Sequence, residues 1–230
     1  MQTTNAITPS RRRSIQKTLL AFVLLLSGWL AYDLFAPRQT SLRQFDATAV
    51  AHLETVMWRS YYDKERLALF TQLASLLRRQ YRMPFVRSYV TAYYAARAAF
   101  VFKAGQERSD YEKALPNLMS YYGAINAMSD QKFDVARVAQ LELEWWIVHR
   151  QRAQHQGGAL APALAELQSA IYQMPVERFA EHARLRTEAM DICDQKTEIN
   201  GATQADWQRI DELLKGSWQS LWQAVQGEGS

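Results

Sequence analysis

Cysteine is almost absent from this chain: Cys193 is the single one among 230 residues. One thiol excludes an internal disulfide and a cysteine-based zinc site. We expect Cys193 to be a small buried apolar residue, as lone cysteines in large domains usually are. A domain of this size forms a stable core without disulfides, so the cysteine count leaves the redox compartment open.

Catalytic and cofactor motifs are also missing. The sequence contains no glycine-rich phosphate loop, no Gly-x-Ser-x-Gly turn and no cysteine–histidine pair of the kind that forms a nucleophile. His52, His155 and His182 show no ligand spacing. The sequence therefore indicates no catalytic residue and no cofactor, and we expect a binding role more than an enzyme.

Acidic residues are absent from the first 17 residues, which hold Arg11, Arg12, Arg13 and Lys17. The whole chain has 27 basic and 23 acidic residues, a formal net charge of +4. Without those four basic residues the charges of the remainder balance. A neutral body lacks the cationic surface that binds a phosphate backbone, which argues against nucleic acid as a partner.

One long hydrophobic run is present, Thr18–Ala36, and Pro37 follows it. A helix of about 19 residues at about 1.5 Å each spans roughly 28 Å, close to the hydrocarbon thickness of a bilayer. Trp29 and Tyr32 stand where an interfacial aromatic anchor is expected, and Asp33 is within a turn of the far end. We predict a transmembrane helix over residues 18–36 that contacts the lipid bilayer.

The flanking charges predict how this helix is oriented. The tail 1–17 carries four basic residues, whereas only Arg38 and Arg43 follow closely. The excess predicts a cytoplasmic tail and a C-terminal domain outside the cytoplasm, periplasmic in a bacterial-type plasma (inner) membrane. A cleaved signal peptide is the main alternative, but cleavage after Ala36 would place Leu34 where small residues are preferred. We favour an uncleaved, single-pass signal anchor.

Beyond the anchor, we predict a polar linker over 37–46, an all-helical domain over 47–226 and a flexible tail over 227–230. Alternating β-branched runs are absent, and apolar residues recur with helical spacing. The predicted fold is all-α, with about seven helices packed as antiparallel hairpins. The expected helices cover about 47–82 (capped by Asp46, with a possible break near Asp63), 85–103, 109–127 (with a possible kink at Pro116), 134–154, 160–173, 176–196 and 203–225.

The middle hairpin resembles a degenerate tetratricopeptide repeat over residues 146–175. Trp146 matches the first aromatic of that family's Trp-x2-Leu-Gly-x2-Tyr pattern, and His149, Arg150 and Ala153 stand at its later positions. The resemblance implies stacked hairpins whose first helices line a groove for extended or helical segments of partner proteins. The pattern of the repeat's second helix is matched by Ala163, Leu167, Ala170 and Pro175. The outer hairpins match it only in part, at Tyr111 and Ala114 and at Ile210 and Leu214.

Glu142 and His149 form the main candidate for chemistry. They are seven residues apart on one predicted helix face, with Trp146 between them. A carboxylate and an imidazole on one buried face can act as an acid–base pair or as two metal ligands. The Glu-x-x-His spacing of di-iron bundles is absent, however. The simpler interpretation is that Glu142 is a buried structural acid with a cationic partner.

Arg97 is the predicted cationic partner, because it lies in an apolar stripe that we expect to face the core. An unpaired buried guanidinium costs several kcal/mol, so we predict an ion pair with Glu142 or, failing that, with Glu54. The other members of the stripe are Val86, Val90, Tyr93 and Phe100.

Large aromatic residues are the remaining candidates for a binding surface: Tyr93, Trp145, Trp146, Trp218 and Trp222. Core packing is the simpler interpretation of each, and partner binding the second. We predict a membrane-anchored protein-interaction or scaffold module with a protein partner. The alternatives are a helical enzyme or metal-binding protein centred on Glu142 and His149, and a structural subunit of a membrane complex. The sequence leaves the oligomeric state open.

Overall fold

The computed structural model describes residues 9–152, 158–199 and 201–226. Ala153, the first eight residues and the tail 227–230 lie outside these ranges. The chain divides into two compact units, Met1–Pro37 and Arg38–Ser230.

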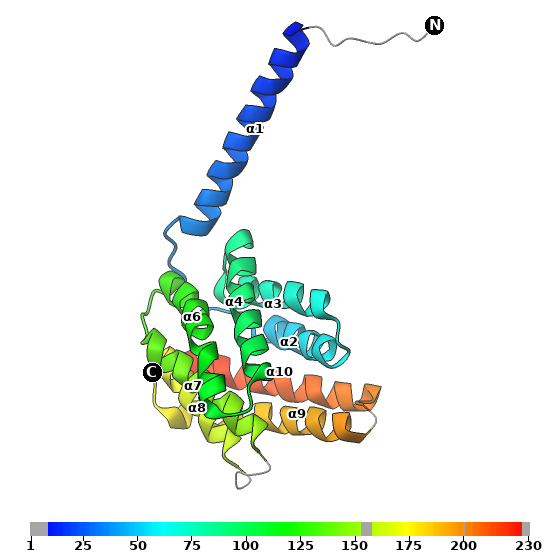
Figure 1. Ribbon diagram of the computed structural model, residues 1–230. Coiled ribbons are helices and arrows are strands. Elements are labelled where there is room, and N and C mark those ends of the chain that lie inside the picture. The colour runs from blue at the N-terminus through cyan, green and yellow to red at the C-terminus, as the bar shows by residue number, and fades with distance from the viewer. Residues whose placement is uncertain (1–8, 153–157, 200, 227–230) are drawn as a thin grey trace, which may run out of the picture. The chain divides into compact units, whose positions relative to one another are not determined.

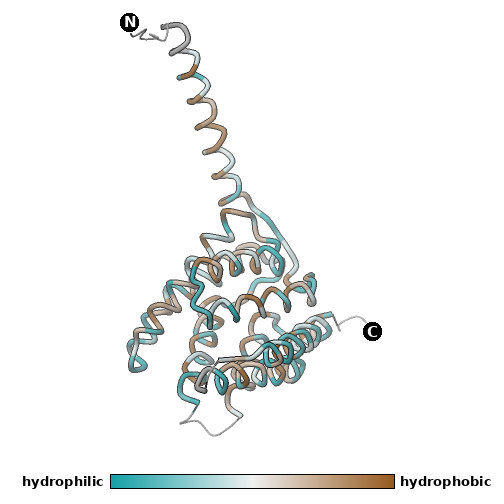
Figure 2. The backbone as a smooth tube through the Cα atoms, turned by 90° about the vertical axis from the view of Figure 1, so that its right-hand side faces the viewer, coloured by the Kyte–Doolittle hydropathy of each residue, from teal (hydrophilic) through white to brown (hydrophobic). Residues whose placement is uncertain are grey.

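The first unit contains the long helix α1 (Pro9–Phe35). Its segment Ser14–Phe35 is long and apolar enough to cross a membrane, and hydrophobic residues follow one another along it (Figure 2). A single apolar helix near the N-terminus is therefore confirmed. The helix begins earlier than the predicted span of 18–36 because the basic segment Arg11–Lys17 has good helix propensity and contains no helix breaker.

The second unit is all-α in its described residues, apart from one isolated bridge between Thr40 and Ser129. The predicted fold class is thus confirmed. The helices are α2 (Ala47–Tyr62), α3 (Arg66–Tyr81), α4 (Phe85–Ala104), α5 (Arg108–Tyr111), α6 (Leu115–Met128), α7 (Val135–Arg150), α8 (Leu160–Tyr172), α9 (Ala180–Ile199) and α10 (Gln204–Gln226), with 3-10 turns η1 (Glu112–Ala114) and η2 (Val176–Phe179).

Local sequence signals account for several helix ends. The Asp46 carboxylate accepts a hydrogen bond from the Ala49 backbone N–H at 2.9 Å, which is the N-cap expected for α2. The break foreseen near Asp63 occurs there, because Lys64 adopts a left-handed φ of 62° between α2 and α3. Pro116 stands in the first turn of α6, where its missing N–H leaves no hydrogen bond unmade.

The helices of the second unit close into a ring (Figure 1). Each packs against the next in the order α2, α3, α4, α6, α7, α8, α9 and α10. The last helix, α10, then packs against the first, α2. The ring therefore gives every one of these helices two neighbours, and no helix is left at an open end.

The segment predicted as a polar linker, 37–46, is mostly part of the ring domain. Leu42 and Phe45 are buried, and the Phe45 ring packs edge-on against Trp218 with centroids 5.7 Å apart. The Thr40 backbone N–H donates to the Met128 carbonyl at 2.7 Å. The linker prediction was wrong beyond about residue 39. Burial of Leu42 and Phe45 in the core is more favourable than their exposure to water in a solvated linker.

Helix α4 buries a different face from the one that its sequence pattern predicted. Ser88, Thr91, Ala92 and Ala98 are its buried residues. The apolar stripe that was predicted to face the core, which includes Val90, Tyr93 and Phe100, is exposed instead. Small side chains on the buried face let α4 pack between α3 and α6, where the larger residues would not fit.

Candidate functional site

Glu54 of α2 and Arg186 of α9 form an enclosed ion pair in the ring domain. Arg186 donates from both terminal nitrogens to the two Glu54 oxygens, at 2.6 and 2.7 Å. The Trp218 indole N–H of α10 adds a third hydrogen bond to Glu54 at 2.6 Å. The Arg186 guanidinium also lies 5.5 Å from the Trp58 ring centroid. These contacts tie α2, α9 and α10 together where the ring closes.

The electrostatics of this site favour the charged form of Arg186. Burial acts to lower the pKa of Arg186, but the charge of Glu54 and the hydrogen bonds to it outweigh burial, and the pKa is raised. Arg186 therefore stays ionised in spite of its enclosure. A bidentate arginine–carboxylate pair of this kind is a fixed structural contact.

Glu142 of α7 has a second set of partners. Its carboxylate accepts from the Tyr122 hydroxyl at 2.6 Å and from the Trp146 indole N–H at 2.9 Å. Burial raises the pKa of Glu142, while the Tyr122 hydrogen bond and the charge of Arg186 oppose the rise. Glu142 thus accepts hydrogen bonds from two neutral side chains, whereas the simpler interpretation had predicted a cationic partner.

The predicted ion pair of Arg97 with Glu142 or Glu54 was wrong. Arg97 lies on the exposed face of α4, and Arg186 occupies the position at Glu54 that was assigned to it. The error follows from the face that α4 buries, since the predicted pair assumed that the apolar stripe faces inward. The sequence did not single out Arg186; the structure places it four residues from His182 and four from Met190, both of which are buried.

His149 does not join Glu142 in an acid–base pair. Its Nε2 lies 2.8 Å from Asp194 Oδ2, and Arg152 reaches the same oxygen at 3.1 Å. The Tyr62 hydroxyl donates to the other Asp194 oxygen at 3.3 Å. Asp194 was not among the predicted site residues. In the part of the chain that the structure describes, no three His, Cys, Asp or Glu side chains are grouped closely enough to hold a metal ion.

Two other titratable side chains are buried near these groups. Cys193 is 1% exposed, as expected, and burial with the nearby charge of Asp194 raises the pKa of its thiol to about 12. His182 is also 1% exposed, and its Nδ1 lies 3.0 Å from the Ser217 carbonyl oxygen. A carbonyl oxygen only accepts, so Nδ1 carries the hydrogen. Burial lowers the pKa of His182 to about 4.

The aromatic candidates for partner binding are divided by their exposure. Trp218 is buried and bonded to Glu54, as the simpler interpretation of core packing predicted, so it is not available as a partner-binding residue. Trp145 and Trp146 are half-buried, and their rings pack edge to face on each other at 6.2 Å. Tyr93 and Trp222 remain available, with exposed fractions of 52% and 37%.

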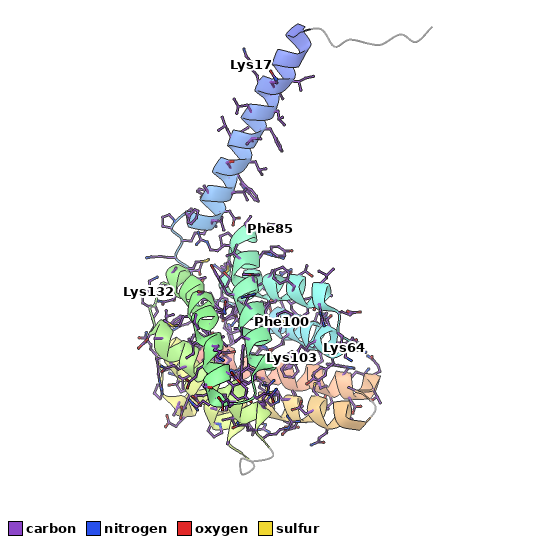
Figure 3. All side chains as sticks on the ribbon, in the orientation of Figure 1. Lys17, Lys64, Phe85, Phe100, Lys103 and Lys132 are labelled. Carbon is purple, nitrogen blue, oxygen red and sulfur yellow. The ribbon has the colours of Figure 1, made fainter. Side chains whose placement is uncertain are left out.

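Tyr93 belongs to a larger exposed surface along the middle of α4, which we name the α4 face: Val90, Tyr93, Arg97 and Phe100. Spacings of three and four residues place these side chains on one side of the helix. Phe100, which is 61% exposed, is labelled toward the lower end of α4 in Figure 3. The α4 face is apolar apart from Arg97 near its middle.

Comparison with known protein families, with curated proteins and with solved structures finds no match for this chain. The resemblance to tetratricopeptide repeats therefore stays a prediction. The geometry of the proposed hairpin is consistent with close packing, since α7 packs against α8 and Leu167 is buried between half-buried Ala163 and Ala170.

Proposed function

We propose that this chain is a single-pass membrane protein whose ring domain acts as a protein-interaction or scaffold module. Helix α1 serves as an uncleaved anchor in a plasma membrane, with the N-terminal tail in the cytoplasm and the ring domain outside it. The apolar length of Ser14–Phe35 and the basic tail before it support this arrangement. Anchoring confines the domain to the bilayer and raises the effective concentration of membrane-bound partners.

The observation that carries the proposal is the exposed α4 face. Soluble surfaces rarely display several large apolar side chains side by side, and such patches mark interaction sites. Val90, Tyr93 and Phe100 are on the outside although Ala92 and Ala98 of the same helix are inside. Arg97 adds a cation near the middle of the patch, which a carboxylate on the partner would pair with.

The buried charged groups support a binding role over catalysis. Glu54 and Arg186 neutralise each other, and Glu142 is held by Tyr122 and Trp146. Each of these groups is occupied by structural contacts. The α4 face, in contrast, is a surface whose apolar side chains the domain's own packing leaves exposed.

Site-specific photo-cross-linking in intact cells tests the proposal. A photoreactive residue at Tyr93 or Phe100 is expected to give a discrete cross-linked protein band, whereas one at the exposed Gln219 of α10 should not. Replacing Val90 with Ser should weaken the band formed from Phe100 without changing the amount of folded protein. Equal cross-linking from Gln219, or none from the α4 face, would contradict the assignment of this surface.

A C-terminal reporter tests the topology separately. Alkaline phosphatase fused after Ser230 is expected to be active and a fluorescent protein fused there dark, because the former needs export and the latter fails to mature after it. The reverse pattern would place the ring domain in the cytoplasm.

A further inference from the structure

Although the body of the chain is neutral overall, its charges are segregated. Residues 66–106, which include α3 and α4, contain seven basic residues and no acidic one. The acids that balance them lie elsewhere in the domain. One region of the ring domain is therefore strongly cationic, and its basic residues are Arg66, Arg78, Arg79, Arg82, Arg87, Arg97 and Lys103.

The densest part of this region is the α3–α4 corner, which we define as Arg78, Arg79, Arg82 and Phe85. Arg79 and Arg82 are exposed, and Phe85 is exposed over 53% of its surface. Figure 3 labels Phe85 at the beginning of α4, at the opposite end from Lys103. Two exposed cations, one half-buried cation and a large exposed aromatic ring thus lie within eight residues of the chain.

Arg78 is held in place although no acid binds it. Its guanidinium lies 5.3 Å from the Phe85 ring centroid and 5.6 Å from that of Tyr89. It also donates to the hydroxyl oxygens of Ser88 and Ser75, at 3.1 and 2.7 Å. Among the described residues, Arg78, Arg79 and Arg82 have no carboxylate partner. The corner therefore keeps its cationic charge available.

The corner also lies where the chain from the anchor enters the domain. The Thr40 hydroxyl donates to the Tyr81 carbonyl at the end of α3, at 3.1 Å. Only four residues, Ala36–Gln39, separate Thr40 from the end of α1. A tether of that size reaches about 17 Å at full extension. A bilayer crossed by α1 is therefore a surface that this corner can meet.

We propose that the α3–α4 corner docks on the anionic headgroups of the bilayer that α1 crosses. Arginine guanidinium groups bind phosphates in a bidentate manner, and an exposed phenylalanine inserts into the interface beside them. Each basic residue at an anionic surface strengthens the contact about fivefold. This contact is separate from the α4 face, because Phe85 and Phe100 are about 22 Å apart along the helix at 1.5 Å per residue.

Charge decides between the bilayer and a second copy of the chain. Pairing two corners would bring arginines of both copies together with no acid between them, and like charges repel at that range. An anionic bilayer, in contrast, offers many phosphates at once to these arginines. The inference needs the anchor but does not depend on the partner protein proposed for the α4 face.

The test uses the full-length chain reconstituted in vesicles, with Cys193→Ser as background. An environment-sensitive fluorophore is attached at Phe85→Cys or, as the matched control, at Phe100→Cys on the same helix. Quenching by spin-labelled lipid is then compared between phosphatidylcholine and an equal mixture of phosphatidylcholine and phosphatidylglycerol. We expect stronger quenching at position 85 than at position 100, and only the former should rise with the anionic lipid.

Charge variants complete the experiment. Arg79→Gln combined with Arg82→Gln is expected to lower the ratio of docked to undocked corner by about 25-fold, at fivefold per arginine. Lys103→Gln, at the other end of α4, should leave the signal unchanged. Circular dichroism checks that each variant is folded. The inference would be overturned if quenching at position 85 changed neither with phosphatidylglycerol nor with the two arginine substitutions. Equal quenching at positions 85 and 100 would also overturn it.

Discussion

At the scale of single residues, Glu54 is a buried carboxylate whose stability depends on its partners. Its two oxygens accept three short hydrogen bonds, two from Arg186 and one from Trp218, and the residue is 2% exposed. A buried pair of this kind adds little net stability compared with two apolar residues. Removal of one partner is costly, because the other is left charged and enclosed.

Glu54→Gln is therefore expected to lower the free energy of unfolding by about 3–5 kcal/mol. The amide keeps the shape of the side chain, but it removes the negative charge that faces Arg186. Denaturant unfolding of the full-length chain in detergent measures the change. Glu188→Gln is the control: its partners Arg184 and Arg209 are surface residues, so the loss should stay below about 1 kcal/mol. Equal losses in both variants would contradict this account of Glu54.

His182 is expected to stay neutral in the folded protein down to about pH 4. Its folded pKa is lower than the ordinary value of 6.5, so below pH 6.5 the unfolded chain binds a proton that the folded chain does not. The stability contributed by neutral His182 is fully present above pH 6.5. It is lost progressively as the pH falls to about 4, by about 3 kcal/mol in total.

The NMR signals of the His182 imidazole check this prediction. The His182 signals should remain in their neutral positions through pH 5 while the protein stays folded. A titration midpoint near pH 6.5 for His182 would show that its imidazole is in contact with water, which would contradict the burial of this side chain.

At the scale of elements, α4 shows how a helix can be predicted correctly while its buried face is not. Its predicted range, 85–103, agrees with the observed Phe85–Ala104 to within a residue. Helix formation depends on local propensity, and four alanines in the central turns favour it. The choice of buried face depends on the space left by α3 and α6, which a local pattern does not contain.

Paired substitutions on opposite faces of α4 test which face is buried. Ala98→Leu should destabilise the protein by about 1–3 kcal/mol, because it adds volume at a fully buried position. Phe100→Ser, two residues later on the exposed face, should change stability by less than about 0.5 kcal/mol. Thermal unfolding measures the stability of the two variants. If α4 instead buried the face that the sequence pattern predicted, Phe100→Ser would be the more destabilising change.

At the scale of the whole domain, the contact between α10 and α2 determines how stability is shared. In an open stack of helical hairpins each unit contacts only its neighbours in sequence, so loss of the last helix leaves the first unaffected. In the ring domain α10 contributes Trp218 to the site of Glu54, and Thr55 of α2 donates to Asp211 of α10 at 3.0 Å. The first and last helices therefore stabilise each other.

A chain that ends at Ile199, without α10, is expected to lose amide protection in α2 as well as in α9. The protection of α2 should fall by at least about tenfold, equivalent to roughly 1.4 kcal/mol of local stability. Hydrogen exchange followed by mass spectrometry gives this value for each helix. Unchanged exchange in α2, with a loss confined to α9, would mean that the ring is open in solution.

Sequence alone determined the features that arise from short stretches of chain. The apolar run Thr18–Ala36 specifies a membrane-length helix, Asp46 caps α2, and helical periodicity gives an all-α body. The burial of Cys193 was also predicted, because a lone cysteine behaves as a small apolar residue. Each of these depends on hydropathy or backbone hydrogen bonding among residues within a turn or two of one another.

Only the tertiary structure decided which charges meet and where the chain closes. Arg97 and Arg186 both lie among apolar residues at helical spacing, but only Arg186 lies opposite Glu54, 132 residues away in sequence. The same holds for Asp194 beside His149 and for α10 against α2. Such partners are chosen by the packing of several helices together, because the cost of an enclosed charge depends on every group around it.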